Sequence, residues 1–213
     1  FALGGDHSIA LANLRATWAR QGRPKQGLAL LHVDSHLDTV DQTLGERYSH
    51  ASPFIRAIEE GLVDPSAMLS VGIKGPLNTK RDLDYAREHD VTIVTCEQYR
   101  ADGAALVRDF IKRLKGRAVY VSFDIDALDP AFAPGTGTLS VGGLTSWEAL
   151  ALVRSWKGAN VVGGDLVEVL PDRDPAGITA MLAAHLVFEI VALDAVRRSA
   201  APSPAGPKKS RSR

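Results

Sequence analysis

The chain has 213 residues, of which 45% are hydrophobic and 23% charged, proportions ordinary for a globular protein with one sizeable core. Its 25 Lys and Arg equal its 25 Asp and Glu, so charge gives no reason to expect nucleic acid or an acidic membrane as a partner. The single cysteine, Cys96, excludes an internal disulfide and is consistent with a reducing cytoplasm. We find no signal peptide and no apolar stretch of the roughly 18 residues that a membrane span needs.

Hydrophobic runs typical of strands alternate along the chain with amphipathic stretches typical of helices. The sequence predicts strands at about residues 28–33, 67–73, 91–95, 118–123 and 161–167. It predicts helices at about residues 8–20, 52–61, 78–89, 102–115, 145–156 and 176–195. Several strands are apolar on both faces, as buried parallel strands must be. We therefore expect an α/β domain with three αβα layers and a mainly parallel sheet.

The two ends of the chain differ from the middle. Residues 1–5 have the pattern of a strand end and a tight turn, without an initiator methionine, so we expect N-terminal strands of the complete domain to be missing. Residues 197–213 are rich in Pro, Ser, Lys and Arg and lack a hydrophobic pattern, which predicts a disordered basic tail. The ordered domain is thus predicted to span residues 1–196.

Side chains able to bind metal follow two of the predicted strands. Asp34, His36 and Asp38 alternate where the strand 28–33 ends, and alternate residues of an extended segment point to one side. Asp124 and Asp126 follow the strand 118–123 in the same way. Taken singly, each motif also suits a capped, solvated loop.

Two more polar residues have comparable positions. His7 follows the Gly4-Gly5 turn, and Glu168 ends the strand 161–167. Ligands of parallel sheets bind at the carboxyl ends of the strands, so we expect all these groups at one edge. Carboxylates with imidazoles and no thiolate suit a hard ion such as Mn²⁺ better than structural zinc. Six ligands suit two ions that share carboxylates and together lower the pKa of a bridging water.

The motifs at residues 4–8, 32–38 and 122–130 occur in an order that resembles the metal motifs of the ureohydrolases, the arginase–agmatinase family. The similarity continues through residues 131–138, 142–145 and 164–169, and covers roughly residues 2–194. The resemblance implies the three-layer arginase/deacetylase-like fold. It also implies a hydrolase that holds two Mn²⁺ ions per chain and converts a guanidino compound to urea and an amine.

The resemblance implies a role for each ligand. One ion would be held by His7, Asp34, Asp38 and Asp124. The other would be held by Asp34, His36, Asp124 and Asp126, so that Asp34 and Asp124 bridge. Asp38 would also orient the hydroxide that attacks the guanidinium carbon.

The resemblance implies three further residues at the substrate. Glu168 would accept hydrogen bonds from the guanidinium, His50 would shuttle a proton to the leaving amine, and Thr145 would contact the substrate. The alternatives are a surface carboxylate for Glu168 and, for His50, a residue that only precedes a helix capped by Ser52.

The chain departs from the family pattern in three places. Ala51 stands where Gly is usual, which costs energy if that position needs a positive φ. Ser35 stands where Ala is usual, a small change that should be tolerated. Residues 139–141 are Leu-Ser-Val, where the family more often has Pro-Glu-Pro or Pro-Val-Pro, and this loop approaches the substrate tail.

Residues 45–62 resemble agmatinases and guanidinobutyrases more than arginases. We therefore expect agmatine as substrate, with putrescine and urea as products, and a guanidino acid such as 4-guanidinobutanoate as the alternative. The choice between these two substrates is expected to depend on Gln42, Glu46 and Arg47. An exposed Arg47 favours a carboxylate tail, and an inward Glu46 favours the amine of agmatine. No nucleic acid or membrane is expected as a partner. We expect a cytoplasmic protein, and the resemblance implies a homo-oligomer, a trimer or hexamer.

Two other classes of protein rank lower. A metal-dependent deacetylase of the related fold would use one zinc with an Asp-His-Asp set and would not need His7 or Asp38. A non-catalytic paralogue would keep the fold without the chemistry, but here all six ligand positions are retained. His32, His89 and His185 are expected to be structural rather than ligands.

Overall fold

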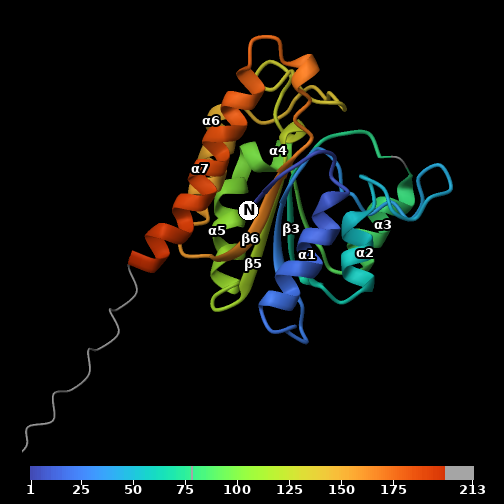
Figure 1. Cartoon of the computed structure of the whole chain (residues 1–213), viewed down its shortest axis with the longest axis vertical. Helices are drawn as coiled ribbons and strands as arrows, with labels where there is room; N and C mark the ends of the chain where they lie inside the picture. Colours follow the sequence, from blue (N-terminus) through green and yellow to red (C-terminus); the bar gives the residue numbers. More distant parts are fainter. Residues whose placement is uncertain (78, 200–213) are drawn as a thin grey trace, which may run out of the picture.

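A computed structural model describes residues 1–77 and 79–199, and its six strands form one parallel sheet in the order β1-β6-β5-β2-β3-β4 (Figure 1). The strands are Ala2–Leu3 (β1), Leu28–Val33 (β2), Val63–Ile73 (β3), Thr92–Thr95 (β4), Ala118–Asp124 (β5) and Asn160–Val167 (β6). The four central strands carry the buried sequence runs from which a parallel sheet was expected, and the predicted sheet is confirmed.

Helices cover both faces of this sheet, which completes the predicted αβα layers (Figure 1). The helices are Ile9–Arg20 (α1), Pro53–Glu59 (α2), Lys80–Glu88 (α3), Cys96–Gln98 (α4), Ala104–Arg113 (α5), Ser146–Ser155 (α6) and Ile178–Ser199 (α7). Shorter turns are Tyr99–Gly103 (η1), Ile125–Ala127 (η2) and Pro171–Arg173 (η3). Because α4, η1 and α5 are continuous, the helix predicted at 102–115 is the second half of a longer helical segment.

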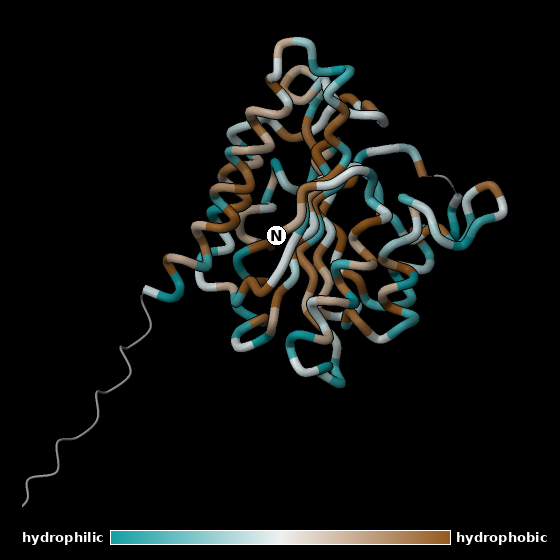
Figure 2. The backbone as a smooth tube through the Cα atoms, in the orientation of Figure 1, coloured by the Kyte–Doolittle hydropathy of each residue, from teal (hydrophilic) through white to brown (hydrophobic). Residues whose placement is uncertain are grey.

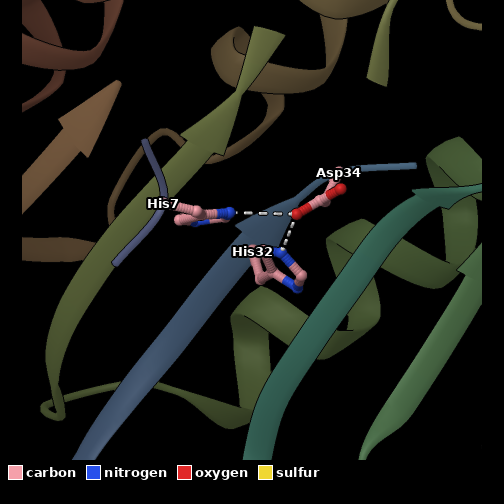
Figure 3. Close-up of side chains that lie close together, drawn as sticks. All are labelled: His7, His32 and Asp34. Carbon is pink, nitrogen blue, oxygen red and sulfur yellow. Dashed lines mark hydrogen bonds and ion pairs between the residues drawn. The ribbon is translucent and has the colours of Figure 1, made fainter. Parts of the chain in front are cut away.

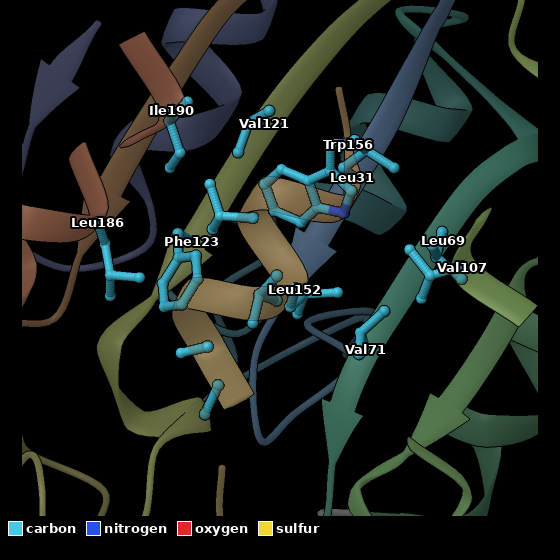
Figure 4. Close-up of a cluster of buried hydrophobic side chains, with 14 of the residues drawn as sticks. Leu31, Leu69, Val71, Val107, Val121, Phe123, Leu152, Trp156, Leu186 and Ile190 are labelled. Carbon is cyan, nitrogen blue, oxygen red and sulfur yellow. The ribbon is translucent and has the colours of Figure 1, made fainter. Parts of the chain in front are cut away.

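Alternate residues of β2 belong to two different cores, as the two-residue period of a strand requires. Leu31 packs with Phe123, Leu152 and Trp156 in the cluster that includes α5, α6 and α7 (Figure 4). Leu30 packs instead with residues of α1, α2 and α3. The hydropathy-coloured tube shows brown, hydrophobic segments both in the strands of the sheet and in the helices packed beside them (Figure 2).

The same alternation continues beyond the apolar residues. His32 lies two residues after Leu30 and Asp34 two residues after His32, so this polar pair follows the face that α1 and α2 cover. The apolar part of each strand therefore forms the core, and the last residues of that same face lead into the site.

The structure corrects two expectations about helix α7. The tail was predicted to begin at residue 197, but α7 continues to Ser199, and the rest of the predicted tail lies outside the described residues. Contrary to the search for apolar stretches, α7 is also long and apolar enough to span a membrane by length and composition. Leu186 and Ile190 of α7 are nevertheless fully buried in the core, so the helix serves as a layer of the domain.

Candidate metal centre

The sheet order places four polar strand ends next to one another. His7 follows β1, Glu168 follows β6, Asp124 ends β5 and Asp34 follows β2, and these strands are neighbours in the order β1-β6-β5-β2. The carboxyl ends of parallel strands lie at one edge, so segments far apart in sequence deliver their side chains to one place.

The first group of atoms surrounds the Nδ1 atom of His7. It lies 3.2 Å from Asp34 Oδ2, 2.9 Å from Asp38 Oδ2 and 3.4 Å from Asp124 Oδ2. All four side chains are buried. These are the four residues that the resemblance assigns to one ion.

The second group of atoms surrounds the Nδ1 atom of His36. It lies 3.3 Å from Asp34 Oδ1 and 3.2 Å from Asp126 Oδ2. The three side chains together have the spacing of a metal-binding group. Asp34 thus turns one oxygen to each histidine, which is the arrangement that a bridging carboxylate needs.

The hydrogen bonds around His7 show that its Nδ1 atom suits a metal. The Ser122 hydroxyl donates to Asp165 Oδ1 at 2.6 Å, and a hydroxyl has one proton, so it accepts from His7 Nε2 at 2.9 Å. In the neutral imidazole, which is the form that binds metal, Nδ1 therefore carries the lone pair. Among the described residues this buried atom has no hydrogen-bond partner, although three carboxylate oxygens surround it. A buried lone pair facing three oxygens fits a shared divalent cation.

The pKa values show how strongly this centre attracts positive charge. Burial acts to lower the pKa of His7, but Asp124, Asp34 and Asp38 outweigh it and raise the pKa well above its usual value. Burial acts likewise on His36, whose pKa Asp126 and Asp34 raise to about 11. Burial and the neighbouring carboxylates Asp126 and Asp34 raise the pKa of Asp124. Such a set needs cations, and metal ions supply more charge than protons.

A row of buried polar residues crosses the sheet one layer beneath these ligands. His32 is paired in register with Ser70 on one side and Ser122 on the other, and Ser122 with Asp165. All four are fully buried. This row supports the ligands from below, because Ser122 holds His7 and His32 holds Asp34.

His32 contacts the ligand Asp34 directly. Its Nε2 donates to Asp34 Oδ2 at 2.9 Å, while its Nδ1 lies 3.0 Å from the Ser70 hydroxyl. Figure 3 shows His7 and His32 approaching the same oxygen of Asp34 from two sides. The expected structural role of His32 is therefore that of a residue orienting a ligand.

Two residues of the centre have unusual backbone conformations. Asp38 has a φ of 51° and Glu168 a φ of 65°, the left-handed region that side chains with a Cβ rarely adopt. Strain of this kind persists where the surrounding structure over-determines it, often at functional sites. In this case it turns both carboxylates inward, since both line the same cavity.

The cavity above the ligands has a volume of about 340 Å³. It is lined by Asp6, His36, Asp38, His50, Ala51, Asp124, Gly137, Thr138 and Glu168. Glu168 Oε1 accepts a hydrogen bond of 2.7 Å from the His7 backbone N–H, and burial raises the pKa of this carboxyl. The structure therefore brings Glu168 and His50 to the predicted ligands, in a space fit for a small molecule.

Other predicted site residues lie elsewhere. The Thr145 hydroxyl accepts from the Glu148 N–H and caps α6, and Thr145 is not among the residues that line the cavity. Gln42, Glu46 and Arg47 do not line it either, and Arg47 pairs with Glu59 at 3.1 Å. Thr145 thus has a structural role as a helix cap.

The structure shows where the residues that depart from the family pattern lie. Ala51 lines the cavity and is absent from the described residues with positive φ, so replacing Gly there carries no conformational cost. Leu139 and Val141 are exposed and outside the cavity lining. Ser35 is fully buried and bonded to Asp126.

Four residues at or beneath the centre were not among those predicted from the sequence. Asp6 and Thr138 line the cavity, and Ser122 and Asp165 hold His7. The strand period could have identified Ser122, which lies two residues before Asp124 on the same strand. The distant partner Asp165 has no such local signal, because its position depends on strand order.

Comparison with known proteins identifies the family of this chain. The sequence model of the arginase family matches residues 1–192, nearly all of the described chain. The chain belongs to the arginase family. Relatives of this arginase-family chain include the mitochondrial guanidino acid hydrolase of Homo sapiens, which is 43% identical over 89% of this chain and 53% of that protein. The mitochondrial agmatinase of Gallus gallus is 42% identical over 89% of this chain and 55% of its own.

Solved structures of the family have the same fold. Proclavaminate amidinohydrolase from Streptomyces clavuligerus matches with a TM-score of 0.84 and 46% identity, over 92% of this chain and 64% of that one. A hypothetical agmatinase from Burkholderia thailandensis matches with a TM-score of 0.81 and 38% identity, over 92% and 59% of the two chains. This arginase-family chain therefore spans about half to two thirds of the length of the relatives it matches.

Proposed function

We propose that this protein is a binuclear-manganese hydrolase that cleaves a guanidino compound to urea and an amine. The observation that carries the proposal is the pair of histidine Nδ1 atoms, each facing carboxylate oxygens, with Asp34 Oδ2 near His7 and Oδ1 near His36. Hard oxygen ligands with two imidazoles suit Mn²⁺. Family membership supports the same reaction class, and a single-zinc deacetylase would leave His7 and Asp38 without a task.

The six ligand residues would hold the metal ions, which when bound would supply the Lewis acidity that makes water nucleophilic at neutral pH. Asp38 lines the cavity and reaches the His7 cluster, so its carboxylate can accept a proton from water and orient it. Glu168 uses Oε1 for the His7 N–H, which leaves Oε2 for an N–H of a guanidinium.

His50 is the remaining residue predicted to take part in the chemistry. It lines the cavity and is exposed at its mouth, so it can exchange protons with solvent. The amine leaving group needs a proton as the C–N bond breaks, and an imidazole is suited to deliver it near neutral pH.

The charge of the cavity favours agmatine among guanidino substrates. Asp6 and Glu168 line the cavity together with the ligands, and the described part of its lining includes no Lys or Arg. With Glu168 at the guanidinium, Asp6 is left to attract the terminal ammonium of agmatine, and it would repel the carboxylate of a guanidino acid. Arg47 is exposed, the outcome expected to favour a carboxylate tail, although its guanidinium pairs with Glu59, and Glu46 is exposed rather than inward. These two residues therefore do not add to the case for agmatine.

The alternative substrate, 4-guanidinobutanoate, has support of its own. Relatives named for guanidino acids include the human protein and a guanidinobutyrase of Pseudomonas aeruginosa that is 38% identical. These names describe those proteins, and a difference of one or two charged side chains at a cavity mouth is enough to change the preferred tail.

The test is urea release by the Mn²⁺-loaded protein from agmatine, 4-guanidinobutanoate and arginine. We expect agmatine to have the highest kcat/KM, and Asp6→Asn to lower that value for agmatine more than for 4-guanidinobutanoate. A preference for 4-guanidinobutanoate would reverse the substrate assignment. A folded protein that binds two ions and releases no urea from any of the three would be a non-catalytic paralogue.

We further propose a cytoplasmic location, with which the single cysteine is consistent, and a homo-oligomer, a trimer or hexamer, as the family resemblance implies. Sedimentation of the Mn²⁺-loaded protein tests the assembly. A sedimentation coefficient that matches one chain at all concentrations would contradict it.

A further inference from the structure

Ser35 lies between the ligands Asp34 and His36, yet its own bonds go to a third ligand, Asp126. The Ser35 N–H donates to Asp126 Oδ1 at 3.1 Å, and its hydroxyl lies 3.0 Å from the same oxygen. The hydroxyl also lies 3.1 Å from the Asp126 carbonyl. Both residues are almost completely buried, so these bonds form away from solvent.

Lys74, directly after β3, decides where the Ser35 proton points. Its Nζ donates to the Ser35 hydroxyl oxygen and to the Asp126 carbonyl, both at 2.9 Å. A hydroxyl has a single proton, and a carboxylate oxygen accepts a stronger bond than a carbonyl already bonded to an ammonium. Ser35 therefore donates to Asp126 Oδ1.

The consequence is that the two oxygens of Asp126 have different tasks. Oδ1 is held by two donors from Ser35. Oδ2 lies 3.2 Å from His36 Nδ1 and accepts from the Thr138 hydroxyl at 2.7 Å. With Oδ1 fixed, the carboxylate cannot rotate Oδ2 away from the group formed with Asp34 and His36.

We propose that Ser35 and Lys74 are positioning residues for the second metal ion, which hold Asp126 with Oδ2 directed at the ion shared with Asp34 and His36. This proposal rests on the dinuclear centre described above. Ser35 stands where the family usually has Ala, and an alanine would keep the backbone bond and lose the hydroxyl. The substitution is then a gain of a support to one ligand rather than a tolerated change.

The arrangement acts on one ion more than on the other. Neither Ser35 nor Lys74 has a hydrogen bond to His7, Asp38 or Asp124 among the described residues. His7 has a separate support, the Ser122 hydroxyl. The two ions should therefore respond differently when the Ser35 bonds are removed.

The experiment is a Mn²⁺ titration of metal-free protein, in which electron paramagnetic resonance counts free Mn²⁺ and detects the coupled signal of a Mn²⁺ pair. The step that loads the ion at Asp34, His36 and Asp126 is called the second step here, whatever the order in which the two sites fill. We expect Ser35→Ala and Lys74→Met each to weaken this step by about 10- to 100-fold, the usual effect of losing a support to a ligand. The other step, called the first, should change less than about twofold, and the coupled signal should appear only at higher Mn²⁺. Lys74→Arg should restore much of the second step.

Ser66 provides a matched control. Its N–H and hydroxyl donate to one oxygen of Asp64 at 3.0 and 2.7 Å, the same Ser–Asp contact on the surface. Ser66→Ala should leave both binding steps unchanged. Unfolding of each metal-free variant in urea reports any effect on folding alone.

The outcomes separate this proposal from the one it rests on. Wild-type protein that binds fewer than two ions overturns the dinuclear centre and, with it, the positioning role. Wild-type protein that binds two ions, with Ser35→Ala and Lys74→Met equal to it in the second step, overturns the positioning role alone. Equal weakening of both steps together with a less stable metal-free protein would also overturn it, because the bonds would then serve folding.

Discussion

His7 Nδ1 and Asp38 Oδ2 lie 2.9 Å apart, although one follows β1 and the other follows β2, and two further strands separate these in the sheet. The contact exists because the turn after β1 carries His7 across β6 and β5 toward Asp38. Asp38 meets it from a backbone with a φ of 51°. The first metal site is thus built where two loops meet above the central strands.

Removal of the His7 imidazole should remove one ion. We expect His7→Ala to reduce the Mn²⁺ content from two ions per chain to about one, and urea release to fall at least about 100-fold. Metal analysis after gel filtration measures the content. The His89 ring bonds to the Tyr85 carbonyl, away from the candidate ligands, so His89→Ala is the control that should keep both ions and full activity. Two ions in the His7→Ala protein would contradict the ligand assignment.

Metal removal should lower stability by a measurable amount. Ions bind the folded chain and not the unfolded one. Free Mn²⁺ at a concentration 100 times its dissociation constant therefore raises the free energy of unfolding by about 2.7 kcal/mol per site. We expect Tm to rise with Mn²⁺ concentration and to return after a chelator is added. Differential scanning calorimetry with Mg²⁺ as a comparison ion checks this. A Tm that does not depend on Mn²⁺ would rule out binding linked to folding.

The Ser122 hydroxyl fixes the tautomer of His7, so its loss should weaken binding of the first ion, the one at His7. We expect Ser122→Ala to lower the affinity of the first Mn²⁺ by about 10- to 100-fold. The free energy of unfolding should fall by about 1–3 kcal/mol, because Asp165 loses a buried donor. Mn²⁺ titration and urea unfolding measure the two effects. Ser155→Ala, which removes a hydroxyl bonded to a helix carbonyl, is the control for metal affinity.

Glu168 tests substrate binding without loss of metal. Glu168→Gln keeps the shape of the side chain and an oxygen for the His7 N–H, but removes the negative charge that attracts a guanidinium. We expect a drop in kcat/KM of about 100-fold or more with two ions still bound. Steady-state kinetics together with metal analysis distinguish a loss of substrate binding from a loss of metal. If the variant loses an ion, Glu168 supports His7 rather than the substrate.

The ion pair of Asp64 and Arg117, remote from the metal centre, should make stability depend on pH. Burial acts to raise the pKa of Asp64, but hydrogen bonds from Arg117 and Ser66 outweigh it and lower the pKa below its usual value. The pair is therefore stabilising above a pH of about 3.9, the pKa of an unfolded Asp, and its contribution is lost as the pH falls through the lower folded value.

Asp64→Asn should accordingly lower the free energy of unfolding by about 1 kcal/mol at pH 7, and by much less near pH 2. Urea unfolding of metal-free protein at the two pH values measures the difference. Asp109→Asn removes an exposed pair with Lys112 and should have little effect at either pH. An equal loss at both pH values for Asp64→Asn would assign the effect to packing.

Much of the fold could be predicted because its signals are local. The run at residues 28–33 is apolar throughout and became β2, and Thr145 and Glu148 form a capping box where helix α6 begins. At Thr145 the same local signal has two interpretations, because the hydroxyl predicted to contact a substrate also accepts the capping hydrogen bond of the helix. The helix end at Ser199 was missed because charged residues do not by themselves stop a helix.

The sequence by itself determined which side chains carry the chemistry, since the alternation of Asp34, His36 and Asp38 after an apolar strand is a property of neighbouring residues. Only the tertiary structure decided which oxygen of each carboxylate faces which histidine, and which buried groups hold them there. Ser122 reaches Asp165, and Ser35 reaches Lys74 and Asp126, through strand order and register. Such contacts depend on the packing of distant strands, which no local spacing records.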